Sequence, residues 1–76
     1  VRFSVPKDGL VTLKVYDMIG QEVATLFSGN AQRGTYTLNW NGKDNSGKYV
    51  SSGSYVYRMS ANSGEFVQTK KMMFLK

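Results

Sequence analysis

The fold of this chain is decided by its last third, residues 53–76, which read GSYVYRMSANSGEFVQTKKMMFLK. Two runs rich in aromatic and β-branched residues flank an Asn-Ser-Gly turn, and in the first run Tyr55, Tyr57 and Met59 recur at every second position. This period of two is typical of a half-buried strand, and a short Asn- and Gly-containing turn joins antiparallel neighbours. We therefore predict a β-hairpin whose second strand continues to the last residue.

The same alternation precedes this hairpin, with turn residues between the runs. The run at 22–27 is also compatible with a helical turn, but its β-branched residues and short length favour a strand. A loop is expected from Ser28 to Gly34, and a polar, Gly-rich connection with one short edge strand at 48–51 is expected over 41–52. With runs at 1–5, 11–16, 22–27 and 35–40, this pattern predicts an all-β antiparallel sandwich of about seven short strands.

Composition limits the size and class of the protein. Seventy-six residues form a single small domain, here residues 1–76, and the absence of Cys leaves its stability to packing or to a partner. Apolar residues make up 41% of the chain, so intrinsic disorder is excluded. No segment approaches the roughly 20 apolar residues of a membrane span. The net charge of +5 is spread along the chain, and no basic run is long enough to predict nucleic-acid binding.

The residues that catalysis usually needs are missing. Without His or Cys the chain cannot form the Ser-His-Asp or Cys-His systems, or the usual zinc sites. Most of the five acidic residues lie in or beside expected turns, where Asp binds its own backbone. The loop at 41–47 has one carboxylate, Asp44, which is too little charge for a tight calcium site. We expect no enzymatic activity, no cofactor and no metal, and a turn held by Asn and Asp side chains.

Aromatic residues recur in a second pattern. Gly-x-Tyr occurs twice, at Gly34–Tyr36 and Gly53–Tyr55, each at the start of an expected strand. We expect each Tyr ring to pack at the edge of the core while its hydroxyl binds loop backbone. Trp40 shares the alternation of Tyr36, which favours a core position, although a row of exposed aromatics would instead form a platform for sugars.

Several of these residues, taken in order, match a known family. The matching positions are Phe3-Ser4-Val5-Pro6, Val11, Leu13, Val15-Tyr16-Asp17, Gly20, Val23, Gly34, Tyr36, Trp40-Asn41-Gly42, Gly47, Ser52-Gly53, Tyr55, Tyr57-Arg58, Lys70-Lys71-Met72 and Leu75-Lys76. The chain resembles the type A C-terminal sorting domain of type IX secretion substrates over essentially its whole length. Its middle part is similar to the immunoglobulin-like domain of flagellar hook-capping proteins.

The resemblance implies a seven-stranded immunoglobulin-like sandwich at the end of a large exported protein of Bacteroidota or related bacteria. The outer-membrane translocon would recognise the folded domain, and a sortase-like peptidase would remove it and join the cargo to anionic lipopolysaccharide. The protein would then pass through the periplasm to the cell surface or the medium. Family members usually carry an Asn-Pro-rich lead-in, which this chain lacks. Because it also begins without Met, we interpret it as a fragment of a longer protein with an N-terminal cargo domain.

The terminal segment supplies the candidate recognition residues, which are Lys70, Lys71, Met72, Leu75 and Lys76. Alternatively, these residues only close the last strand and solubilise its outer side. The residues expected to hold the sandwich together are Gly34, Tyr36, Trp40, Gly42, Gly53, Tyr55 and Tyr57. Two other functions stay open: an assembly module that self-associates through exposed strand edges, and a carbohydrate-binding module.

Overall fold

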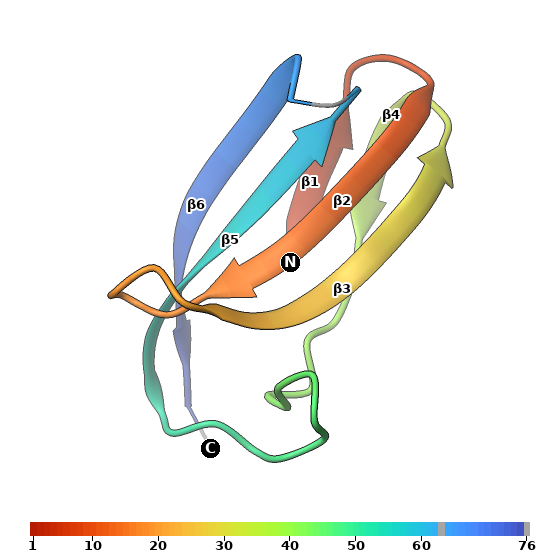
Figure 1. The fold of residues 1–76 in the computed structure, drawn as a ribbon. Helices are drawn as coiled ribbons and strands as arrows, with labels where there is room; N and C mark the ends of the chain where they lie inside the picture. The colour runs from red at the N-terminus through yellow and green to blue at the C-terminus, as the bar shows by residue number, and fades with distance from the viewer. Residues whose placement is uncertain (63, 76) are drawn as a thin grey trace.

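The computed structural model describes residues 1–62 and 64–75, which form two antiparallel sheets and, within that part of the chain, no helix (Figure 1). The smaller sheet has the order β1-β4 and the larger one β3-β2-β5-β6. The all-β antiparallel sandwich predicted from the alternation is confirmed. The strands are β1 (Arg2–Val5), β2 (Gly9–Tyr16), β3 (Glu22–Ala31), β4 (Gly34–Thr37), β5 (Gly53–Ala61) and β6 (Phe66–Phe74).

The predicted number of strands was too high, because the described residues form six strands and not seven. The expected edge strand at 48–51 is replaced by a single bridge between Lys43 and Tyr49. Between these two residues the chain is folded into a tight turn by the carboxylate of Asp44, which accepts hydrogen bonds from the backbone N–H groups of Ser46 and Lys48. A chain closed so tightly leaves too few extended residues for a ladder.

Strand boundaries also differ from the prediction, and β2 begins at Gly9, two residues earlier than expected. β4 ends at Thr37, so Trp40 lies in the following loop, where its indole N–H donates to the carbonyl of Lys43 at 3.0 Å. β3 is a strand, as favoured over a helical turn, but it continues to Ala31 through residues expected to form a loop. It does so because the start of β2 offers it a partner, with Gly9 opposite Ala31 and Val11 opposite Gly29.

The core consists of the apolar positions of the alternating runs. Val11, Leu13 and Val15 of β2 lie on the same inner face of the larger sheet as Met59 of β5, and all four of these side chains are at most 1% exposed. No charged or polar residue is buried among the residues that the structure describes. The remaining buried residues are Phe3, Val5, Ala24, Tyr55, Tyr57 and Ala61. Apolar burial on both inner faces therefore holds the two sheets together.

The two Gly-x-Tyr motifs adopt the same local arrangement. Gly34 and Gly53 are the first residues of β4 and β5. The hydroxyl of Tyr36 donates to the carbonyl of Gln32, and that of Tyr55 donates to the carbonyl of Ser51, in both cases four residues upstream. The expectation that these hydroxyls bind loop backbone is confirmed. Each motif fastens the loop before it to the edge of the core.

Candidate functional site

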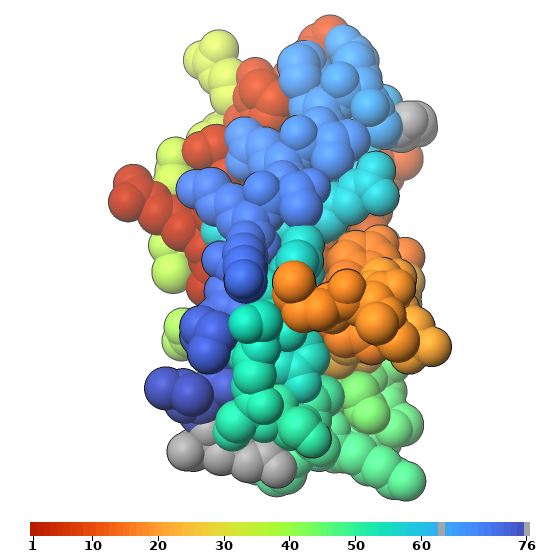
Figure 2. Space-filling model, turned by 90° about the vertical axis from the view of Figure 1, so that its left-hand side faces the viewer, coloured from red at the N-terminus to blue at the C-terminus, as the bar shows by residue number. Residues whose placement is uncertain are grey.

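The last strand, β6, lies at one edge of the larger sheet and is paired on one side only. It pairs with β5 over its whole length, from Ala61 opposite Phe66 to Gly53 opposite Phe74. The space-filling view shows this strand lying across the surface of the molecule (Figure 2). Most of its nine residues are exposed. The predicted hairpin is confirmed, and Ser63 of its turn lies outside the described residues. The prediction that the second strand continues to the last residue was wrong, because β6 ends at Phe74 and Leu75 lies beyond it.

The structure divides the predicted recognition residues into two groups. Lys70 and Lys71 are exposed on β6, and Leu75, just beyond the strand, is 74% exposed. Met72 is half-buried and packs against the core. Lys76 lies outside the described residues. The terminal segment therefore offers a partner two ammonium groups and one leucine.

Two further apolar side chains of β6 are presented to solvent, and the sequence analysis did not single them out. Val67 is 43% exposed and Met73 is 64% exposed. Val67 lies opposite Ser60 and Met73 lies opposite Ser54 on β5. Because Ser60 and Ser54 are each next to a buried residue of β5, they lie on the face turned away from the core, and so do Val67 and Met73. The sequence signal that could have identified them is the period of two along the hairpin, because it places Met73 on the opposite face of the strand from Met72.

The outer face of the larger sheet, defined as the face turned away from the core, carries a row of basic residues. Lys14 of β2 lies opposite Arg58 of β5, and Lys71 of β6 is opposite Val56, one step along the same face. Lys14 is paired with Glu22 at 2.8 Å, whereas Arg58 has no side-chain partner among the described residues. Arg58 and Lys71 therefore give the outer face beside β6 an uncompensated positive charge.

The end of β6 is anchored by a cluster of aromatic rings. The ring of Phe74 lies 5.1 Å from that of Trp40, which in turn meets Tyr55 edge to face at 5.2 Å. Gly42, with a positive φ of 78°, passes directly under Phe74, because a Cβ there would be 2.1 Å from the ring. The Trp40–Gly42 loop thus holds the terminal segment against the sandwich.

The same geometry bears on the sugar-platform alternative. Tyr55 is 8% exposed, and Tyr36 and Trp40 are partly buried against the core. Tyr36 stacks on Phe3 with ring centroids 5.5 Å apart. These three aromatics therefore pack within the sandwich and do not form an exposed row, which leaves the carbohydrate-binding alternative without its expected surface.

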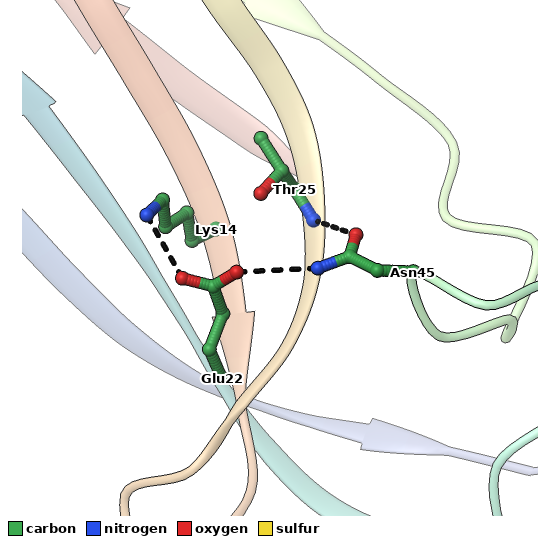
Figure 3. Close-up of polar contacts among 4 residues, drawn as sticks. All are labelled: Lys14, Glu22, Thr25 and Asn45. Carbon is green, nitrogen blue, oxygen red and sulfur yellow. Dashed lines mark hydrogen bonds and ion pairs between the residues drawn. The ribbon is translucent and has the colours of Figure 1, made fainter.

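A polar network fastens the 41–52 loop to the far edge of the sheet, on β3 (Figure 3). The carboxylate of Glu22 accepts hydrogen bonds from Lys14 at 2.8 Å and from the amide of Asn45 at 3.2 Å. The amide oxygen of Asn45 accepts the backbone N–H of Thr25 at 2.9 Å. The backbone N–H of Asn45 donates to the carbonyl of Val23 at 3.0 Å. Asn45 therefore acts like a short strand added to the edge of β3.

Protonation of this network follows from its contacts. The hydrogen bond from Lys14 holds the pKa of Glu22 below its ordinary value of 4.5, and the same bond raises the pKa of Lys14 above 10.5. Hydrogen bonds from the Ser46 hydroxyl and the Lys48 N–H lower the pKa of Asp44. Asp44 is thus occupied by its own turn, as expected, and the described residues contain no cluster of acidic side chains that could hold a metal.

A pH dependence of stability follows, with a sign set by these shifts. Groups whose pKa is lowered by folding stabilise the fold above their ordinary pKa, and this stabilisation is lost as the pH falls through the folded value. We expect the melting temperature to fall below about pH 4.5, and to fall less in Glu22→Gln. Thermal unfolding between pH 7 and pH 3 measures this, with Glu65→Gln as the control. An equal fall in Glu22→Gln and the parent chain would show that Glu22 contributes nothing.

Comparison with known proteins identifies the family. A family model described as the FlgD Ig-like domain matches residues 4–65, which include β2 to β5 and end immediately before β6. No curated protein and no solved structure matches the chain. No helix in the described part of the chain is long and apolar enough to cross a membrane. The expected relationship to the immunoglobulin-like domain of flagellar hook-capping proteins is confirmed, and the chain belongs to the FlgD Ig-like domain family.

Proposed function

We propose that this domain is a non-catalytic sorting signal that directs an exported cargo protein through the outer-membrane type IX translocon to the cell surface. The observation that carries the proposal is the character of β6. This strand is exposed, basic and partly apolar, and it lies beyond the region matched by the family model. The match to the family model ends at residue 65, so β6 is the strand of this sandwich about which the family match says nothing.

The chemistry of the chain supports this role. A signal that is recognised in the folded state needs a stable scaffold and a presented surface, and neither requires a nucleophile or a metal. The scaffold here is a dry apolar core, and the presented surface is an edge strand with Lys70 and Lys71 exposed. In this proposal the partners are the translocon, a sortase-like peptidase and an N-terminal cargo domain of the same protein.

Charge reversal on β6 tests the proposal. We would fuse the domain to a periplasm-targeted fluorescent reporter in a type IX-competent bacterium and measure surface fluorescence beside a strain lacking the translocon. We expect translocon-dependent display of the parent chain, and at least a tenfold loss with Lys70→Glu and Lys71→Glu together, which corresponds to about 1.4 kcal/mol of binding free energy. Deleting the segment would be less informative, because Met72 and Phe74 pack against the core.

The matched control changes the same charge elsewhere. Lys7→Glu with Arg33→Glu lies in exposed loops outside β6 and should leave display unchanged. Circular dichroism of each purified variant confirms that it is folded. Reporter retained in the periplasm of both strains with the folded parent domain would exclude the sorting function.

The edge position of β6 also favours a second candidate, an assembly module that pairs with other subunits. An uncovered strand at the edge of a sheet is a template for pairing with another chain. Sedimentation of the purified domain distinguishes this function, because it predicts oligomers that dissociate on dilution. A monomer at the highest attainable concentration would count against it.

A further inference from the structure

The hydrogen-bond register shows which backbone groups of β6 are unpaired. The N–H of Asn62 donates to the carbonyl of Leu10 at 2.9 Å, just beyond the pair of Val11 and Ala61. Because bonded and non-bonded pairs alternate in an antiparallel ladder, Ser60, Arg58 and Val56 bond to β2, and their neighbours on β5 bond to β6. On β6 the residues bonded to β5 are therefore Phe66, Gln68, Lys70, Met72 and Phe74.

The intervening residues turn their backbone N–H and C=O groups away from the sheet. These are Val67, Thr69, Lys71 and Met73, and their side chains also lie on the outer face. Within residues 1–62 and 64–75, no hydrogen bond reaches these outward groups. β6 therefore presents a continuous row of unpaired donors and acceptors over the length that one added strand would need.

Two other strand edges are covered in part. Just before β1, the amino group and the carbonyl of Val1 both form hydrogen bonds with Leu38. Because bonded and non-bonded pairs alternate, the backbone N–H and C=O of Arg2 point away from β4. The carbonyl of Arg2 is then occupied by the hydroxyl of Tyr57 at 3.0 Å. On β3, Asn45 occupies the outward groups of Val23 and Thr25. The edge of β6 differs from both because no side chain of the described residues covers it.

The charges around β6 determine which strand fits its edge. If β6 paired with β6 of a second copy about its centre, Lys70 and Lys71 of the two copies would come together, and like charges placed opposite each other destabilise a sheet. A partner strand with a carboxylate opposite Lys71 would instead meet Lys71 and the unpaired Arg58. Val67 and Met73 lie on the same face of β6 and are 43% and 64% exposed, so they add apolar contact surface along this edge.

We propose that the export partner recognises this domain by strand addition. In this mode an extended acidic segment of the partner pairs with the free edge of β6. This inference rests on the proposed sorting function and names how the site is recognised. Backbone hydrogen bonds to Thr69 and Lys71 supply affinity that does not depend on side chains. The positive charge of Lys71 and Arg58 selects an acidic partner over a second copy of this chain.

A proline at Thr69 tests strand addition, because it removes an outward N–H that the fold does not use. Proline is tolerated on edge strands where the N–H faces solvent. In the export assay we expect Thr69→Pro to lower surface display at least tenfold, which corresponds to about 1.4 kcal/mol of binding free energy. Thr69→Val, which keeps the N–H, should be displayed like the parent. Normal display of a folded Thr69→Pro variant would overturn strand addition, whereas failure of the parent domain would overturn the sorting function itself.

A second measurement covers the case in which Thr69→Pro does not fold. We would add a synthetic ten-residue peptide of alternating valine and glutamate to the parent domain and follow amide hydrogen exchange. We expect the amides of Thr69 and Lys71 to become protected, while that of Lys70, already bonded to β5, changes little. An alternating valine and lysine peptide is the control. Equal protection by both peptides, or by neither, would overturn an acidic occupant.

Discussion

Gly42→Ala is expected to destabilise the domain by about 3 kcal/mol and to loosen the end of β6. The positive φ of 78° costs an alanine about 1 kcal/mol. In addition, the new Cβ would lie 2.1 Å from Phe74, so the ring must move away from its contact with Trp40. Displacing a half-buried aromatic side chain costs about 2 kcal/mol more. Thermal unfolding should show a melting temperature lower by about 15 °C.

Gly47→Ala separates the two contributions. Gly47 has a similar φ of 87°, but nothing lies within 4 Å of a Cβ built there. Gly47→Ala should therefore lower the free energy of unfolding only by the backbone contribution of about 1 kcal/mol. Similar losses in the two variants would show that the contact with Phe74 does not matter, and that the Trp40–Gly42 loop does not anchor the terminal segment.

Leu13→Ala is expected to cost about 3–4 kcal/mol of stability. Leu13 is fully buried in β2, the strand paired on both sides, and lies between Phe27 and Met59. A chain of 76 residues has a total stability of about 4–11 kcal/mol, so this loss removes about a quarter of it or more, and near the lower end of that range it leaves a large unfolded fraction. If the folded domain is the signal, surface display of the reporter should be lost as well.

Leu10→Ala is the matched control for this prediction. Leu10 lies on the same strand but is 59% exposed, so the same substitution should change stability by no more than about 0.5 kcal/mol. Chemical denaturation measures both variants, and the export assay follows display. Normal display of an unfolded Leu13→Ala domain would mean that a linear segment, and not the folded sandwich, is recognised.

Some features were predictable because they depend on neighbours in the sequence. The hairpin of β5 and β6 followed from two alternating runs and one turn, and the buried face of β2 followed from its period of two. The hydroxyl bonds of Tyr36 and Tyr55 span four residues, so they too are local. The Asp44 turn is of the same kind, because its carboxylate binds residues two and four positions ahead.

Other features depend on partners far away in the chain. The length of β3 was underestimated because its Ser28–Ala31 part is held by the start of β2. Trp40 was predicted to lie in a strand, because no residue near it in the sequence indicates that its ring packs against Phe74 and Tyr55. Within the candidate site, Met72 and Met73 are the same residue type, and only the tertiary structure shows that Met72 packs against the core whereas Met73 is 64% exposed.

By itself, the sequence determined the all-β class, the terminal hairpin, the inward face of each alternating run and the positive charge at the end of the chain. These follow from periodicity, turn chemistry and composition, which are properties of short segments. Only the tertiary structure decided which strand edges are covered. Part of the edge of β3 is covered by Asn45, 20 residues from Thr25, and part of that of β1 by Tyr57, 55 residues from Arg2. Such contacts form only when the sheets pack, so the free edge of β6 emerges from the assembled fold.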